Sequence, residues 1–222
     1  MTFGAEGREE RRAVPVPRLV DHEVRRREIT GAVRRVIVDG GLEAVTFQSV
    51  AAEAGISVRL VQYYFGTKKE FLLATHRSVM ETAAARFMQR WEALGSDATP
   101  REAISALLNE LLPLDDARRE EAIVLGAFNT ASISGNGITA EETLAAPRAL
   151  VAVVAEQLRR TQHLEPSVDP ELDAELVLAA IGGIAQGMLP GHYTPELAVD
   201  LVDRLLDRIL GTKQLSAHPT NI

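Results

Sequence analysis

The chain has 222 residues, of which 46% are hydrophobic and 25% charged, a composition typical of globular proteins with a sizeable core. It contains no cysteine, which excludes disulfides, cysteine-ligated zinc and thiol catalysis and permits a reducing cytoplasm. The net charge is −7, but residues 1–70 hold 12 Lys and Arg against 10 Asp and Glu, while the rest of the chain holds 12 against 21. Because the basic charge is concentrated near the N-terminus, the overall acidity does not exclude a nucleic-acid partner.

Residues 1–20 are polar and interrupted by prolines, with no apolar period that could bury a face, so we expect a flexible N-terminal tail. Its arginines are suited to phosphate or minor-groove contacts, but three acids in the same stretch weaken that reading. The N-terminus also lacks the apolar segment of a signal peptide, which predicts a cytoplasmic protein.

The next stretch, residues 21–39, carries an apolar stripe at helical spacing through Ile29, Ala32, Val33 and Val36 and stops at two glycines. A cluster of three arginines, residues 25–27, lies near its start. Two interpretations stay open for these arginines: contacts to a nucleic-acid backbone, or a solvated helix face.

Two short helices joined by a three-residue turn are predicted between residues 46 and 69. Thr46 can cap the first helix, Gly55 suits the left-handed residue that ends it, and Ser57 can cap the second. This arrangement, with a small residue at Ala51 and a core anchor at Val61, is what a helix-turn-helix requires. The apolar stripe of the first helix consists of Phe47, Val50, Ala51 and Ala54.

Residues 55–71, GISVRLVQYYFGTKKEF, closely resemble the helix-turn-helix signature of TetR-type transcriptional regulators, with its aromatic pair, Phe-Gly, small hydroxyl and lysine. The resemblance covers about residues 22–72 and implies a three-helix DNA-binding domain at residues 21–67. Two departures concern the DNA sequence recognised and not the fold: Gln62 replaces a usual aromatic residue, and Tyr64 replaces a common histidine.

The resemblance also places the side chains that would contact DNA. Phosphate contacts are expected from one group and base contacts in the major groove from another, with arginine suited to guanine and glutamine to adenine. Ser57, the cap of the second helix, completes the set, Phe65 belongs to the core, and a purely core role for Tyr63 and Tyr64 stays open. The phosphate candidates are Thr46, Gln48, Tyr64 and Lys68; the groove candidates are Val58, Arg59, Leu60, Gln62 and Tyr63.

The remaining chain contains only helical patterns, so the expected fold is all-α, with about nine helices. A long helix from residue 68 to about 94 would connect the DNA-binding domain to a larger helical regulatory and dimerisation domain, residues 68–211, followed by a flexible tail, 212–222. Pro147 predicts a kink or break in the helix at 138–160. The other predicted helices span residues 101–112, 115–132, 169–189 and 195–210.

The last two helices, about 169–189 and 195–210, are apolar enough to indicate that the core continues into a second subunit. Residues 176–189 carry no charge, and the final helix has a broad apolar side, so we expect a homodimer interface there. TetR-like proteins usually dimerise through their last two helices, and residues 181–210 resemble the C-terminal region of the BetI-like branch.

A small-molecule effector of unknown identity is expected in the C-terminal domain, and each candidate side chain for its cavity is also compatible with ordinary core packing. One tryptophan and three tyrosines offer little for an aromatic cage around a quaternary ammonium ligand. The candidates are Phe87, Trp91, Phe128, Asn129, Gln186 and Met188.

The sequence thus predicts a ligand-responsive transcriptional regulator that binds a palindromic operator as a homodimer and is released by its effector; repression is the usual mode of the resembled family. The alternative is a constitutive or protein-regulated helix-turn-helix protein, which a collapsed C-terminal domain would favour. A helical enzyme is a remote third reading, because the five histidines have no metal-binding spacing and no nucleotide-binding or hydrolase motif occurs. We expect no cofactor, no bound metal and no membrane span.

Overall fold

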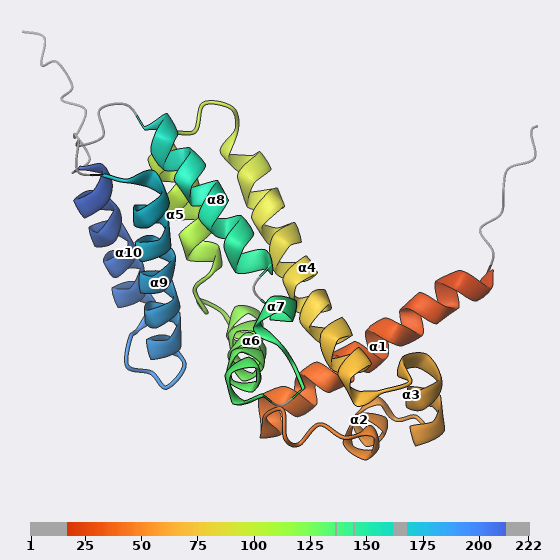
Figure 1. Ribbon diagram of the computed structural model, residues 1–222. Helices are drawn as coiled ribbons and strands as arrows, with labels where there is room; N and C mark the ends of the chain where they lie inside the picture. Colours follow the sequence, from red (N-terminus) through yellow and green to blue (C-terminus); the bar gives the residue numbers. More distant parts are fainter. Residues whose placement is uncertain (1–16, 136, 144, 162–167, 212–222) are drawn as a thin grey trace, which may run out of the picture.

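The computed structural model describes residues 17–135, 137–143, 145–161 and 168–211. Within these ranges the chain forms ten helices and no strands, which confirms the all-α prediction (Figure 1). The helices are α1 (Pro17–Gly40), α2 (Phe47–Ala54), α3 (Val58–Phe65), α4 (Lys68–Leu94), α5 (Pro100–Glu110), α6 (Asp116–Ser134), α7 (Ala140–Thr143), α8 (Ala145–Arg160), α9 (Pro170–Met188) and α10 (Pro195–Leu210).

The helix count is one higher than the expected nine because the segment predicted as a single helix at 138–160 divides into α7 and α8. The division falls between Thr143 and Ala145, two residues before Pro147 on the α8 side. A proline in the first turn of a helix loses no backbone hydrogen bond, whereas one in the interior would. The break predicted close to Pro147 falls at residue 144, which lies outside the described residues, so it stays a prediction.

Helix α1 begins at Pro17, four residues before the start expected from its apolar stripe. Proline is favourable at a first helical position because its missing N–H has no intrahelical acceptor there. The last four residues of the predicted N-terminal tail are therefore helical, and residues 1–16 lie outside the described part, as does the predicted tail at 212–222.

The turn between α2 and α3 has the predicted geometry. Thr46 accepts a hydrogen bond from the Ser49 N–H at 3.0 Å, and Ser49 Oγ accepts one from the Thr46 N–H at 2.9 Å, which closes a capping box. Gly55 ends α2 at φ 65°, a left-handed conformation in which a side chain would be strained. Ser57 caps α3 by accepting from the Leu60 N–H at 3.2 Å. Local hydrogen bonds thus set where both helices begin.

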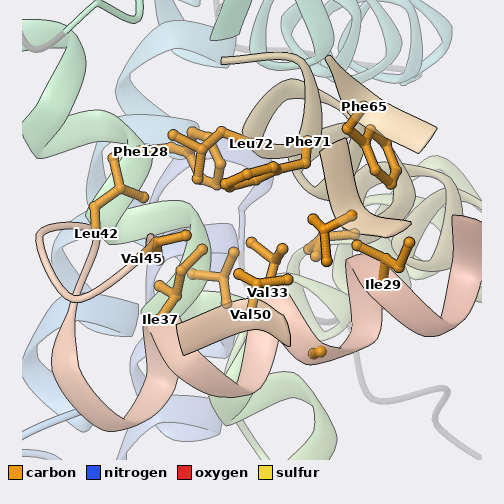
Figure 2. Packing of buried hydrophobic residues seen from close by; sticks show 14 of the residues in the cluster. Ile29, Val33, Ile37, Leu42, Val45, Val50, Phe65, Phe71, Leu72 and Phe128 are labelled. Carbon is orange, nitrogen blue, oxygen red and sulfur yellow. The ribbon is translucent and has the colours of Figure 1, made fainter. Parts of the chain in front are cut away.

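One hydrophobic cluster joins the N-terminal unit, α1 to α3, with the start of α4 and the end of α6 (Figure 2). Phe71 of α4 packs edge-to-face on Phe47 of α2 and on Phe65 of α3, with ring centroids 5.2 and 6.3 Å apart. From α6, Val124 and Phe128 enter the same cluster and are fully buried. The orientation of the N-terminal unit therefore depends on packing against α4 and α6.

A second hydrophobic cluster lies in the C-terminal lobe, formed by α5, α8, α9 and α10. Helix α4 runs from the N-terminal unit to this lobe, and α9 and α10 lie side by side at its outer edge (Figure 1). The first helix of the lobe, α5, contributes Leu107 and Leu108, and α10 contributes Val202 and Leu206. Helix α4 connects the two clusters, since Phe71 and Val79 belong to the first and Phe87 packs against the second.

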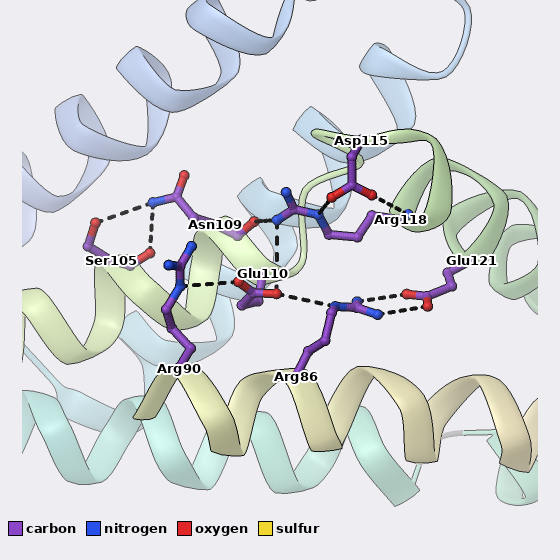
Figure 3. A network of polar contacts seen from close by, with 8 residues as sticks. All are labelled: Arg86, Arg90, Ser105, Asn109, Glu110, Asp115, Arg118 and Glu121. Carbon is purple, nitrogen blue, oxygen red and sulfur yellow. Dashed lines mark hydrogen bonds and ion pairs between the residues drawn. The ribbon is translucent and has the colours of Figure 1, made fainter. Parts of the chain in front are cut away.

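A charged network ties α4 to α5 and α6 between the two clusters (Figure 3). Both terminal nitrogens of Arg86 donate to the carboxylate of Glu121, at 2.8 and 2.7 Å, and its Nε donates to Glu110 at 3.4 Å. The hydrogen bond to Glu121 raises the pKa of Arg86 above its ordinary value. Arg90 and Arg118 reach Glu110 from α4 and α6, at 3.3 and 3.9 Å. This network fixes the crossing of α4 over the start of α6.

We predict that Glu121→Gln lowers the free energy of unfolding by about 2 kcal/mol, because one charge-assisted bond to Arg86 is lost in a partly buried site. The Glu121 side chain is 7% exposed and that of Arg86 is 29% exposed, so the arginine keeps access to solvent and to Glu110. Chemical denaturation at fixed protein concentration measures the change. Glu156→Gln, at an exposed pair with Arg159, is the control and should change stability by less than about 0.5 kcal/mol; equal losses in both variants would contradict the prediction.

Candidate nucleic-acid interface

Helix α3 exposes one face of three side chains, Arg59, Gln62 and Tyr63, at positions i, i+3 and i+4. Its opposite face is anchored in the first hydrophobic cluster by Val61 and Phe65, which are 0% and 1% exposed. Tyr63 is 74% exposed, so a purely core role for this residue is wrong. A guanidinium, an amide and a phenol on one rigid helix face are groups that address base edges and phosphates.

The other two groove candidates, Val58 and Leu60, and the phosphate candidate Tyr64 flank this face. Val58 and Tyr64 are half-buried and pack against the first cluster, and Leu60 is half-buried as well. The ring of Tyr64 lies 4.6 Å from that of His22 in α1 and 5.3 Å from that of Tyr63. Val58, Leu60 and Tyr64 thus support the helix and leave only part of their surface for a partner.

The remaining candidates lie at the N-termini of the three helices α2, α3 and α4. Thr46 and Ser57 are the N-caps of α2 and α3, Gln48 is exposed in the first turn of α2, and Lys68 is exposed at the first position of α4. Helix N-termini present free N–H groups and partial positive charge, which favours an anion. The geometry suits phosphate contacts at these positions.

The arginine cluster of α1 divides into different roles. Arg26 donates to the backbone carbonyl of Tyr64 at 2.6 Å, and its guanidinium lies 4.1 Å from the centroid of the Phe65 ring. It therefore fixes α1 to the end of α3, a structural role that sequence reasoning did not assign. Arg25 pairs with Glu28 at 2.5 Å, and Arg27 is exposed.

Lys69, next to Lys68, contacts the short helix α7. Its Nζ lies 2.9 Å from Glu142 of α7, and the N–H of Thr139 donates to the same carboxylate at 2.9 Å. The bond from Thr139 and that from Lys69 hold the pKa of Glu142 below its ordinary value. The start of α4 is thus linked to α7 as well as to the N-terminal unit. The sequence Lys68-Lys69 did not predict the ion pair between Lys69 and Glu142.

The six effector candidates do not share one cavity. Phe128 is 0% exposed in the first cluster, where its ring lies edge-on 5.0 Å from His76; burial lowers the pKa of that histidine. Met188 is buried in the second cluster, and Asn129 and Gln186 are exposed on α6 and α9. Only Phe87 and Trp91 lie together, with ring centroids 5.7 Å apart.

Phe87 and Trp91 line a groove of about 370 Å³ between α4 and α8. The residues of α8 that line the groove were not predicted from the sequence. They recur at helical spacing, but their residue types do not indicate a binding site. The groove is mostly apolar, with two polar side chains at Glu156 and Gln157, and Glu156 pairs with Arg159 at 3.1 Å. Its remaining lining residues are Met88, Ala152 and Val153.

Two further observations concern the described residues alone. They contain no group of three or more His, Asp or Glu side chains arranged to hold a metal ion. None of their helices is long and apolar enough to cross a membrane.

Comparison with protein families identifies both halves of the chain. Residues 29–75 match the model of bacterial regulatory proteins of the tetR family, and residues 100–211 match the model of the C-terminal region of BetI-type transcriptional repressors. The second match alone covers half of the chain. The chain is 32% identical to the HTH-type transcriptional regulator BetI of Rhizobium meliloti (strain 1021) over 92% of this chain and 98% of the relative. It is 28% identical to the HTH-type transcriptional regulator PksA of Bacillus subtilis (strain 168) over 77% and 81% of the two chains.

Solved structures agree with the fold. A transcriptional regulator from Rhodococcus sp. Rha1 matches with a TM-score of 0.72 and 27% identity, over 83% of this chain and 95% of that one. A regulator from Saccharomonospora viridis, solved in complex with choline, matches with a TM-score of 0.74 and 23% identity, over 83% and 96%. The arrangement of an N-terminal helix-turn-helix and a helical C-terminal lobe is shared by both.

Proposed function

Because this chain belongs to the TetR family of transcriptional regulators, and is not an enzyme, we propose that it binds a palindromic operator as a homodimer and is released by a small molecule. The observation that carries the proposal is the exposed α3 face of Arg59, Gln62 and Tyr63, held by buried Val61 and Phe65. We propose that the protein represses transcription, which is the usual mode of the family. The proposed DNA contacts are Thr46, Gln48, Ser57, Val58, Arg59, Leu60, Gln62, Tyr63, Tyr64 and Lys68.

The surface of α9 and α10 supports the homodimer. Leu172 and Leu176 of α9 are 64% and 63% exposed, and Leu197 of α10 is 43% exposed. Gly182 and Gly183 continue the exposed side of α9, and a Cβ placed on either would meet no atom within 4 Å. Small residues beside exposed leucines let a second helix approach closely, so a second copy of the chain is the proposed occupant. A two-fold axis there would place two α3 helices on half-sites about 34–36 Å apart.

The groove between α4 and α8 supports ligand control over constitutive binding. Its volume and its apolar lining with a few polar groups are typical of small-molecule sites, and it borders α4, which leads to the N-terminal unit. A ligand wedged against Phe87 and Trp91 would favour a different position of α4 and therefore a different separation of the two α3 helices.

The proposed effector has an apolar body and one polar group. Choline, bound by the Saccharomonospora viridis relative, is a poor fit, because two aromatic rings do not form a cage and the Glu156 carboxylate is already paired with Arg159. A release screen that includes choline and apolar metabolites distinguishes these classes.

Selection of genomic DNA by the purified protein tests the central proposal. We expect a palindromic sequence to be enriched, with two half-sites about one helical turn apart. Enrichment no greater than with random DNA would refute operator binding. An operator complex that none of the screened compounds dissociates would favour the constitutive alternative.

Arg59→Ala should weaken operator binding by about 1–3 kcal/mol, because a bidentate contact to a base edge is lost, while binding to random DNA stays nearly unchanged. Fluorescence anisotropy with operator and scrambled duplexes at one salt concentration measures both. Lys68→Ala is the matched comparison: loss of a phosphate contact should weaken binding to both duplexes and flatten the salt dependence. An equal loss on both duplexes for Arg59→Ala would make Arg59 a phosphate contact.

A further inference from the structure

A second pocket lies where α1 crosses α4, on a different stretch of α4 from the effector groove. It has a volume of about 210 Å³, and its polar lining comes from Arg27, Thr30 and Arg34 of α1 and from Thr75, Ser78 and Thr82 of α4. No carboxylate is among the residues that line it. At about 30 Å³ per water molecule, the space holds an ion with several oxygens.

Arg34 lines this pocket and has one buried nitrogen without a partner. Its Nε is inaccessible to solvent and has no hydrogen-bond acceptor, the one buried side-chain nitrogen or oxygen in the described ranges of which this is true. Its Nη2 lies 3.5 Å from Glu120 of α6, a long pair that leaves the Nε unsatisfied. Because the Nε is inaccessible even to water, an ion in the pocket would contact the terminal nitrogens of Arg34 and not its Nε.

Arg27 adds a second guanidinium from the same side of α1, seven residues or about two turns before Arg34. Its Nε donates weakly to the Glu23 carbonyl at 3.4 Å, and no acid among the described residues pairs with its terminal nitrogens. The two arginines therefore bring positive charge and several free donors to one pocket.

The hydroxyl groups complete the lining without adding negative charge. Those of Thr30, Thr75 and Thr82 donate to backbone carbonyls, at 3.0, 2.8 and 2.9 Å. Ser78 has no side-chain hydrogen bond to the described residues, so its hydroxyl is a further donor beside the arginines. Because the three threonine hydroxyls already donate to carbonyls, the donors left for an anion are the two guanidinium groups and the Ser78 hydroxyl, and no acid in the lining opposes an anion.

We propose that this pocket binds a small oxyanion, either a phosphate or a carboxylate group, at the crossing of α1 and α4. The ion accepts hydrogen bonds from Arg27, Arg34 and Ser78. Since α1 belongs to the N-terminal unit and α4 leads to the C-terminal lobe, the bound ion cross-links the two and stabilises their present orientation. The site is separate from the effector groove and from the DNA-reading face, and it does not depend on either.

Isothermal titration calorimetry of the full-length protein without DNA tests the proposal. Phosphate and malonate are titrated separately, with chloride replacing each ion at constant ionic strength. Wild-type protein should bind one ion per chain. Arg34→Gln and Arg27→Gln should each weaken binding by roughly tenfold, the effect of losing one charge-assisted hydrogen bond. Two variants are needed because Arg34→Gln also removes the ion pair with Glu120, which could disturb the fold, whereas Arg27→Gln removes no ion pair among the described residues.

Arg35→Gln is the matched control, because Arg35 follows Arg34 on α1 but pairs with Glu53 outside the pocket. It should bind like wild type. Binding of phosphate alone identifies an inorganic or phosphoryl ligand, and binding of malonate alone identifies a carboxylate. No binding by the wild type, or equal binding in both pocket variants, overturns the proposal. Loss of binding in Arg59→Gln with retention in Arg34→Gln would place the ion on α3 and overturn it as well.

Discussion

Leu176→Arg should convert the proposed dimer into monomers and weaken operator binding by at least about 100-fold. Leu176 is 63% exposed and begins the uncharged part of α9, next to exposed Leu172. In a two-fold interface each substitution occurs twice, so two arginines would be buried without acid partners. A monomer reads one half-site, which removes most of the affinity for a palindrome.

Ile133→Arg is the control for this substitution. Ile133 is 88% exposed on α6, so it introduces the same charge at an apolar surface position outside α9 and α10. Sedimentation velocity at micromolar concentration gives the oligomeric state, and anisotropy with operator DNA gives the affinity. A Leu176→Arg protein that remains a dimer would show that the interface lies elsewhere.

Phe128→Ala should lower the free energy of unfolding by about 3–5 kcal/mol, the usual cost of removing a buried phenylalanine ring. The side chain is fully buried, and it packs edge-on against His76 of α4 in the cluster that also holds Phe71 and Leu72. The cavity would loosen the contact of α6 with α4, so operator affinity should fall as well, through a less fixed orientation of the N-terminal unit.

Urea denaturation at one protein concentration measures the effect, because the stability of a dimer depends on concentration. Phe87→Ala is the matched comparison: its ring is half-buried in the α4–α8 groove, so the loss should be clearly smaller. Phe87→Ala should also reduce the response to an effector. If Phe128→Ala changed the effector response and left stability intact, Phe128 would be a ligand contact and not a core residue.

The elements predicted best are those whose ends are fixed by local chemistry. Thr46, Gly55 and Ser57 set the α2–α3 turn through hydrogen bonds within three residues, and Asp169 and Thr194 cap α9 and α10 in the same way. Helix α4 runs from Lys68 to Leu94, as its uninterrupted pattern indicated. The start of α1 was placed too late because its first turn begins with Pro17 and does not carry the apolar stripe on which the prediction relied.

Contacts between distant segments could not be read from the sequence. The helical spacing of Phe128 is compatible with any buried face of α6, and only the fold shows that this face meets α1 and α4 and not a ligand cavity. Arg26 belonged to an arginine cluster with two open interpretations, and its bond to Tyr64 joins residues 38 apart. On α3, by contrast, the core anchors followed from the helical period, so the exposed face could be predicted.

The cluster of α1, α2, α3, α4 and α6 also bears on how the molecule unfolds. A boundary between residues 67 and 68 passes through this cluster, because Phe71 and Leu72 lie just beyond it and Val124 and Phe128 arrive from α6. A fragment ending at residue 67 would leave the inner sides of Val61 and Phe65 in water. We therefore expect the helix-turn-helix and the middle of the chain to unfold as one cooperative unit, so that hydrogen exchange shows α1, α3 and the first half of α4 opening together.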